Sequence, residues 1–170
     1  NCYLVEGYTD VIQLHQRGLE NVVSSSGTAL TESQIRMIRR LCTTITLIFD
    51  ADQAGIRTSM SSIDLILAEG LNVRVLSLPE GEDPDSFARH HDLEEITTYF
   101  ESNQIDFITY KAQVLLKEAN DPITTSEAIR EIVKSIWHIN DPIKRELYVR
   151  QCVDTFQLSE AVVYKALADI

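Results

Sequence analysis

The stretch Ile45-Thr46-Leu47-Ile48-Phe49-Asp50-Ala51-Asp52 decides the fold. Its first five residues are apolar or β-branched on both faces, which is typical of a strand buried inside a parallel sheet. Two carboxylates follow at once, at positions i and i+2, which face the same way on an extended segment. They repel each other unless a cation lies between them, so we interpret the pair as functional. An ordinary loop acid at Asp50 is the structural alternative.

Three more apolar runs occur in the first half of the chain, and helix-length segments separate them. The runs are Tyr3–Val5, Asn21–Val23 and Val73–Leu78. The helical patterns cover Tyr8 to Arg17, Thr31 to Leu41 and Gln53 to Glu69. A capping box opens the second, and glycines follow the first and third. This alternation predicts an α/β fold in which helices flank a parallel sheet.

The apolar period after residue 100 is helical, and no strand pattern is visible there. A stripe from Ile105 to Ala119, a Thr124-x-x-Glu127 cap, an Asp141-Pro142 start and a start at Ser159 predict four helices. We therefore expect an α/β domain over residues 1–100 and a helical subdomain, a small bundle, over residues 101–170.

The acidic charge of the chain is concentrated in its first half. The formal net charge is −11 and the pI about 4.7, which taken alone argues against a nucleic-acid binder. Residues 1–100 carry 15 acidic and 7 basic side chains, a net −8, whereas residues 101–170 carry 11 and 8, a net −3. Over half of the acids in the first hundred residues fall in three clusters: Glu6 and Asp10; Asp50 and Asp52; and Glu80, Glu82, Asp83 and Asp85.

Each acidic cluster follows the end of a predicted strand. The carboxyl ends of parallel strands meet at one edge of an open sheet, so we expect six carboxylates to share one crevice: Glu6, Asp10, Asp50, Asp52, Asp83 and Asp85. Hard oxygen ligands without nearby His or Cys suit Mg²⁺ or Mn²⁺ rather than Zn²⁺. Glu6 as an acid at a helix start and Asp83 as an N-cap are the structural alternatives.

Other residues carry weaker signals. The loop at Gly27 and Thr28 follows the second strand, and its N–H groups are candidates for phosphate binding, although a plain turn is equally compatible. The three cysteines, Cys2, Cys42 and Cys152, lack metal-ligand spacing, so we expect reduced thiols in a cytoplasmic protein. No run is long enough to cross a membrane. Neither a signal peptide nor an initiator Met precedes Asn1, so we expect a segment of a longer protein.

Four segments, in this order, resemble the Toprim domain of bacterial replicative DNA primase: Val5–Val11, Ser26–Thr31, Phe49–Gly55 and Leu78–Asp85. The Glu-Gly and Asp-x-Asp motifs alone would indicate only the wider Toprim group. The Gly-Thr pair and the Glu-Asp-Pro-Asp run narrow the resemblance to primase. The motifs cover residues 3–87, and residues 101–170 resemble, more weakly, the helical subdomain that ends the primase RNA polymerase region.

The resemblance implies metal-dependent synthesis of short RNA primers on a single-stranded DNA template from ribonucleoside triphosphates. Glu6, Asp50 and Asp52 would hold two catalytic Mg²⁺ or Mn²⁺ ions, and Asp10, Asp83 and Asp85 would complete the metal site. The family's zinc-binding domain, its basic template-binding part and its domain for the replicative helicase would all lie outside this chain. We therefore expect the isolated chain to be inactive.

Four other classes compete with this interpretation. Other Toprim enzymes, such as topoisomerases and nucleases, share the acidic motifs. A phosphotransfer hydrolase with an Asp-x-Asp site would need Thr or Val where Ala54 stands, and its motif would follow the first strand. A receiver domain would need a Lys at a late strand end, but residues 1–110 contain none. A non-catalytic module would use the helices as a docking face.

Overall fold

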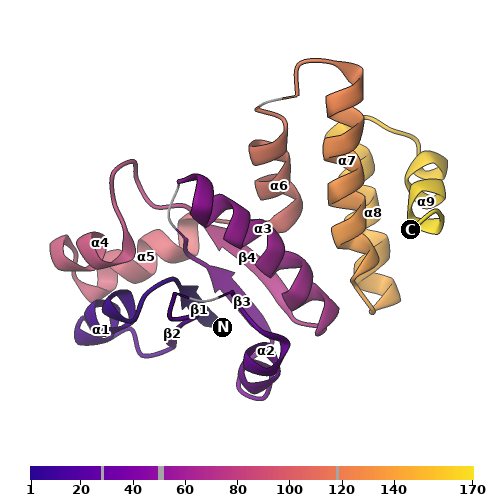
Figure 1. Cartoon of the computed structure of the whole chain (residues 1–170). Helices are drawn as coiled ribbons and strands as arrows, with labels where there is room; N and C mark the ends of the chain where they lie inside the picture. The colour runs from indigo at the N-terminus through magenta and orange to yellow at the C-terminus, as the bar shows by residue number, and fades with distance from the viewer. Residues whose placement is uncertain (28, 50–51, 118) are drawn as a thin grey trace. The chain divides into compact units, whose positions relative to one another are not determined.

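The computed structural model describes residues 1–27, 29–49, 52–117 and 119–170 (Figure 1). These residues form two compact units, Asn1–Asp106 and Phe107–Ile170. The sequence placed the boundary at residue 100, whereas the sheet-containing unit extends to Asp106.

The first unit is built on a sheet that has five strands within the described residues, in the order β2-β1-β3-β4-β5. The strands are β1 (Cys2–Val5), β2 (Val22–Ser24), β3 (Thr44–Leu47), β4 (Asn72–Leu76) and β5 (Gln104–Asp106). The first four are parallel, as predicted. β5 runs antiparallel to β4, so the expectation that no strand follows residue 100 was wrong. A strand of three residues is too short to show an alternating period.

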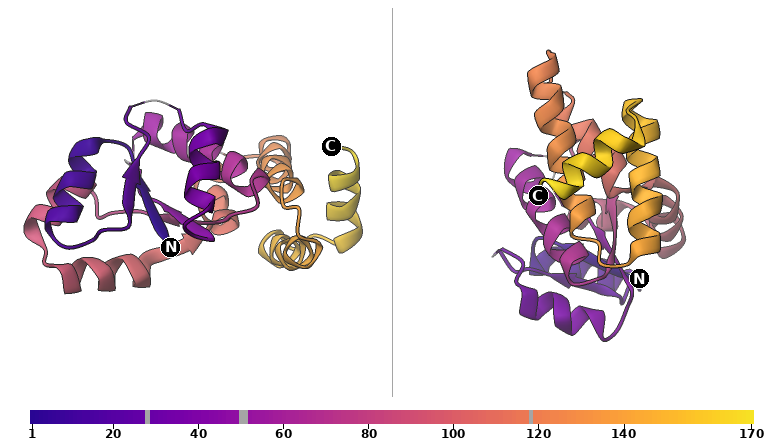
Figure 2. Two further views of the ribbon diagram at one scale, coloured as in Figure 1. Left: turned by 90° about the horizontal axis from the view of Figure 1, so that it is seen from below. Right: turned by 90° about the vertical axis from the view of Figure 1, so that its right-hand side faces the viewer.

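Helices cover both faces of this sheet (Figure 1; Figure 2). They are α1 (Tyr8–Gln16), α2 (Glu32–Arg39), α3 (Gln53–Ala68), α4 (Pro84–His90) and α5 (Leu93–Asn103). The connections β1–α1–β2 and β3–α3–β4 step in opposite directions along the sheet, so right-handed crossovers put α1 and α3 on opposite faces. The capping box that opens α2 is confirmed: Thr31 Oγ1 accepts from the Gln34 amide at 3.3 Å.

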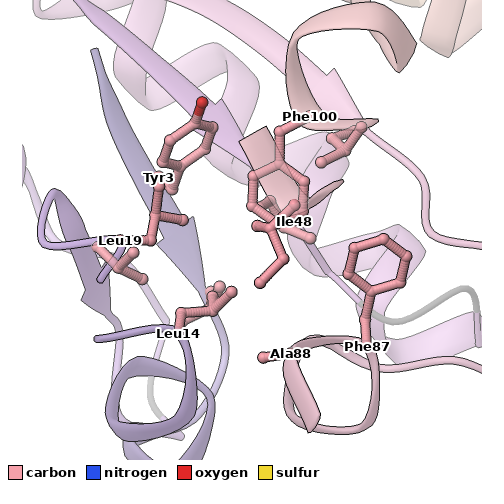
Figure 3. Packing of buried hydrophobic residues seen from close by; sticks show 11 residues of the cluster. Tyr3, Leu14, Leu19, Ile48, Phe87, Ala88 and Phe100 are labelled. Atoms are coloured by element: carbon pink, nitrogen blue, oxygen red, sulfur yellow. The ribbon is translucent and has the colours of Figure 1, made fainter. Parts of the chain in front are cut away.

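The core on the α1 face joins the sheet to α1, α4 and α5 (Figure 3). Tyr3 of β1 meets Phe100 of α5 edge to face, with ring centroids 5.1 Å apart. Phe87 of α4 stacks on the same Phe100 ring at 6.1 Å. Leu14 of α1 and Ile48, just after β3, are fully buried beside them. Helices α4 and α5 therefore belong to the sheet-containing unit.

The second unit is helical throughout its described residues, as predicted. Its helices are α6 (Phe107–Leu115), α7 (Pro122–Trp137), α8 (Pro142–Phe156) and α9 (Glu160–Ala168). Asp141 caps α8, as expected, and its Oδ1 accepts from the amides of Ile143 at 2.9 Å and Lys144 at 3.1 Å. The cap predicted at Thr124 was wrong, because Asp121 caps α7 from an Asp-Pro pair three residues earlier.

A buried lysine links α6 to α7 in this unit. Lys111 is 1% exposed, and its Nζ donates to Ser135 Oγ at 2.6 Å. A buried ammonium group is costly unless it is hydrogen-bonded, so this contact fixes how the two helices pack. In the described part of the chain, no helix is both long and apolar enough to cross a membrane.

The three thiols should differ in reactivity. Burial raises the pKa of the Cys2 and Cys152 thiols to about 11. At pH 8 only about one in a thousand of these thiols would be thiolate, the nucleophilic form. We expect iodoacetamide to modify the half-exposed Cys42 first and to reach the other two only in denaturant, as followed by mass spectrometry. Equal rates for all three thiols in the native protein would contradict this placement.

The role of α5 in the sheet-containing unit can be tested at Phe100. The change Phe100→Ala removes a fully buried ring and should lower the free energy of unfolding by about 3–5 kcal/mol. The control is Ser102→Ala, at an exposed position of the same helix, and it should change the free energy of unfolding by less than about 0.5 kcal/mol. Urea denaturation measures both, and similar midpoints for the two variants would place α5 outside the core.

Candidate metal centre

The candidate site lies at the carboxyl edge of the sheet, at the point where the order in which strands are added to the sheet reverses. β1 pairs with β2 on one side and with β3 on the other, so the topological switch point lies between β1 and β3. Ligands of open α/β sheets bind in the crevice at such a point. The Ile48 amide donates to the Leu4 carbonyl at 2.9 Å, so the β1–β3 pairing continues to the ends of both strands.

Glu6 is the first residue after β1, and it is half-buried. It lines a cavity of about 340 Å³ together with the loop after β2 and one face of α3. The full lining is Glu6, Ser25, Gly27, Ala29, Leu30, Thr58, Ser61, Ser62 and Leu65. The cavity therefore lies directly beside the predicted metal ligand Glu6.

The loop after β2 folds back over Glu6. Ser26 has φ 58° and Gly27 has φ 74°, and these left-handed conformations turn the chain sharply. The Gly27 amide donates to the Glu6 carbonyl oxygen at 3.4 Å. Gly27 thus has a structural role, because its N–H already has an acceptor. Thr28 lies outside the described residues, and phosphate binding by this loop stays a prediction.

Asp10 lies in the first turn of α1, close to Glu6 in sequence. Its Oδ2 accepts from the Gly7 amide at 3.0 Å, so Asp10 satisfies the N-cap amide at the start of this helix, while Gly7 has no side chain to return the bond. A Cβ at position 7 would come within 3.3 Å of the same oxygen. The small residue between Glu6 and α1 therefore lets Asp10 turn back toward the strand end.

The Asp-x-Asp motif is only partly described. Asp50 lies outside the described residues. Asp52 is exposed and caps α3, with its Oδ1 accepting from the Gly55 amide at 2.7 Å. The positive end of a 16-residue helix dipole therefore lies against this carboxylate.

The third acidic cluster follows β4 and begins α4. Asp83 caps this helix, and its Oδ1 accepts from the Ser86 amide at 2.6 Å, while a metal role for the same side chain stays a prediction. Asp85, in the first turn, forms an ion pair with Arg89 at 2.9 Å. Glu82 contacts the Ser86 hydroxyl and lies 3.8 Å from His90 Nδ1.

The strand order places the carboxyl ends of β1, β3 and β4 next to one another at one edge of the sheet, and Glu6, Asp52 and Asp83 come after these three strands in the chain. Among the residues that the structure describes, however, no three His, Cys, Asp or Glu side chains form a group able to hold a metal ion. The expected group includes Asp50, so the six-carboxylate crevice stays a prediction.

Sequence reasoning missed the hydroxyl side of the cavity. Thr58, Ser61 and Ser62 lie at positions i, i+3 and i+4 of α3 and share the face that lines the cavity. Their helical spacing, which puts three hydroxyl groups on one face of α3, was the available signal.

Two family models match the chain. A Toprim-like model matches residues 3–88, which cover the sheet-containing unit up to α4. A model described as the DnaB-helicase binding domain of primase matches residues 110–161. This second match lies within the chain, whereas the expectation was that the family's domain for the replicative helicase lies outside it. That expectation was based on the order of domains in the family rather than on residues 110–161 themselves.

Individual relatives agree with these matches. The chain is 32% identical over 168 residues to a DNA primase of Clostridium acetobutylicum, covering 97% of this chain and 28% of that protein. A DNA primase domain from Pseudomonas aeruginosa is 28% identical, with a TM-score of 0.83, covering 98% of this chain and 54% of that one. The zinc-binding and RNA polymerase domains of Aquifex aeolicus primase are 29% identical, with a TM-score of 0.74 and coverage of 95% and 38%.

The chain spans about a quarter of the length of the curated relatives that it matches. Its sheet order, the acidic residues that follow the neighbouring strands and the matched family model agree with one another. The chain belongs to the Toprim-like family, and along almost its whole length it is similar to bacterial DNA primases.

Proposed function

We propose that this chain supplies the metal-binding part of a DNA primase, which makes short RNA primers on single-stranded DNA from ribonucleoside triphosphates. The observation that carries the proposal is the position of Glu6 and of Asp52, after β1 and β3 at the switch point of a Toprim-like sheet. Carboxylates at this point suit a reaction between two phosphate-bearing partners, because divalent cations can screen the charges that meet there.

The donor atoms fit Mg²⁺ or Mn²⁺. The described candidates are carboxylates, the hard oxygen ligands that these ions prefer. Asp52 and Asp83 each cap a helix through Oδ1, so capping leaves Oδ2 of both side chains for a second interaction. Glu6, Asp50 and Asp52 would hold two ions, and Asp10, Asp83 and Asp85 would complete the site.

Bound ions would make the primer 3′-hydroxyl more acidic and neutralise the pyrophosphate leaving group. The chain's own residues fix the carboxylates in place. The Gly55 amide orients Asp52, the Gly7 amide orients Asp10, and Arg89 forms an ion pair with Asp85. Glu6 is half-buried against the loop after β2, where fewer water molecules compete for its carboxylate.

The charge distribution implies that template contacts come from elsewhere in the protein. Phosphate affinity comes mainly from Lys and Arg, and residues 1–100 carry a net −8. The match of residues 110–161 to a helicase-binding model supports a role for α6, α7 and α8 in contacting the replicative helicase.

Mn²⁺ should stabilise the fold through Asp50 and Asp52. At one hundred times its Kd, Mn²⁺ should add about 2.7 kcal/mol to the free energy of unfolding. In the double variant Asp50→Asn/Asp52→Asn this gain should largely vanish. Its stability without metal should stay equal or rise, because the two side chains no longer repel each other and Asn at position 52 still caps α3. Melting curves with and without Mn²⁺ measure both effects.

The capping control separates the two roles of Asp52. Asp52→Ala should lose about 1 kcal/mol without metal, because the Gly55 amide loses its acceptor. An undiminished Mn²⁺ shift in the double Asn variant would exclude these residues from the metal site.

The isolated 170-residue chain should not make primers. With a net −8 over residues 1–100, it should hold a DNA template weakly, so we expect no template-dependent incorporation of labelled ribonucleotides. The full-length protein that contains this chain should incorporate them, and its Asp50→Asn/Asp52→Asn form should not. Primer synthesis by the isolated chain would show that the acidic unit needs no basic partner.

A further inference from the structure

The cavity beside Glu6 has a wall of hydroxyl groups. Thr58, Ser61 and Ser62 of α3 line it opposite the loop after β2. Thr58 Oγ1 donates to the Ala54 carbonyl at 2.9 Å, and Ser61 Oγ donates to the Thr58 carbonyl at 3.0 Å. Because a hydroxyl that donates keeps its lone pairs, both oxygens can still accept a hydrogen bond from a ligand.

Ser62 differs from its two neighbours. The residue is only 1% exposed, and its Oγ has no hydrogen-bond partner among the described residues. In the described part of the chain, every fully buried side-chain N or O atom has a hydrogen-bond partner. The Ser62 hydroxyl has none there, so it is not fully buried, and it is the part of this residue that reaches the cavity. A nearly buried hydroxyl that meets only a cavity forms its hydrogen bonds with water there, or with a ligand that displaces the water.

The chemistry of the lining restricts the occupant. No described lining residue is Lys or Arg, and the Glu6 carboxylate would repel an anion, so a phosphate is disfavoured. None of the described lining residues has an aromatic ring on which a base could stack. Ala29, Leu30 and Leu65 supply apolar surface for C–H groups, and hydroxyls supply the polar contacts. A neutral ring that carries hydroxyls, such as a sugar, matches both surfaces.

We infer that this cavity binds the ribose of a ribonucleotide and that Ser62 forms a hydrogen bond with its 2′-hydroxyl. The inference rests on the proposed function, in which the sugar's 3′-hydroxyl lies near Glu6. The vicinal 2′-hydroxyl is then the group that can point into the cavity. It is both donor and acceptor, as is the Ser62 hydroxyl, and it distinguishes ribonucleotides from deoxyribonucleotides.

The test compares ATP with 2′-deoxy-ATP, each with Mg²⁺, on the 170-residue chain. Saturation-transfer NMR titration suits the weak binding expected without a basic partner. ATP should bind about fivefold more tightly than 2′-deoxy-ATP, the effect of one hydrogen bond. In Ser62→Ala this preference should disappear. The matched control is Ser59→Ala, which should keep it, because Ser59 is 2% exposed on the same helix, donates to the Gly55 carbonyl at 2.9 Å and does not line the cavity.

A second readout locates the ligand directly. The methyl groups of Ala29, Leu30 and Leu65 should transfer saturation mainly to the ribose protons and least to adenine H2 and H8. Stronger transfer to adenine would overturn the inference, and so would equal affinity for the two nucleotides or no binding of either. If Mn²⁺ still stabilises the chain through Asp50 and Asp52 in those cases, only the sugar subsite fails. If that stabilisation is absent, the proposed metal centre fails as well.

Discussion

Strand β1 pairs in parallel with β2 along one edge and with β3 along the other, and all four of its residues are buried. It has no free edge and no solvent face, so the chain first becomes available to a ligand at Glu6, directly after it. The Ile48–Leu4 bond extends the β3 pairing, and the Ser25 amide, which donates to the Val5 carbonyl at 3.4 Å, extends the β2 pairing. The position of Glu6 and of the loop beside it follows from how β1 is enclosed.

Most of this enclosure could be predicted from the sequence. The run at residues 45–49 is apolar on both faces, and β3 occupies Thr44–Leu47. Gly18 and Gly70, with φ 97° and 80°, follow α1 and α3 as expected of left-handed residues after helices. Short elements were harder to predict from the sequence. β5 has only three residues and α4 only seven, so neither is long enough to show a clear apolar period. Their pairing partners are also distant in sequence, so tertiary contacts determine them.

The candidate site was predictable in its residues but not in their individual roles. Aspartate is favoured as an N-cap and as a ligand for a hard cation for the same reason, because both put positive charge against a carboxylate. Asp52 and Asp83 are caps in the structure, and this is compatible with a second oxygen serving a metal. Sequence spacing cannot separate the two roles, since each needs the acid directly after a strand and before a helix. The hydroxyls of α3 depend on which face of that helix meets the β2 loop, and tertiary packing determines this.

The short strand β5 lies at the outer side of β4 and pairs with it from Arg74 to Leu76. Without these three residues, the backbone of β4 would be an open edge flanked by the buried apolar side chains of Val73 and Val75. Open edges of this kind pair with strands of other molecules. β5 covers this edge of the sheet, and its pairing with β4 therefore disfavours self-association through β4.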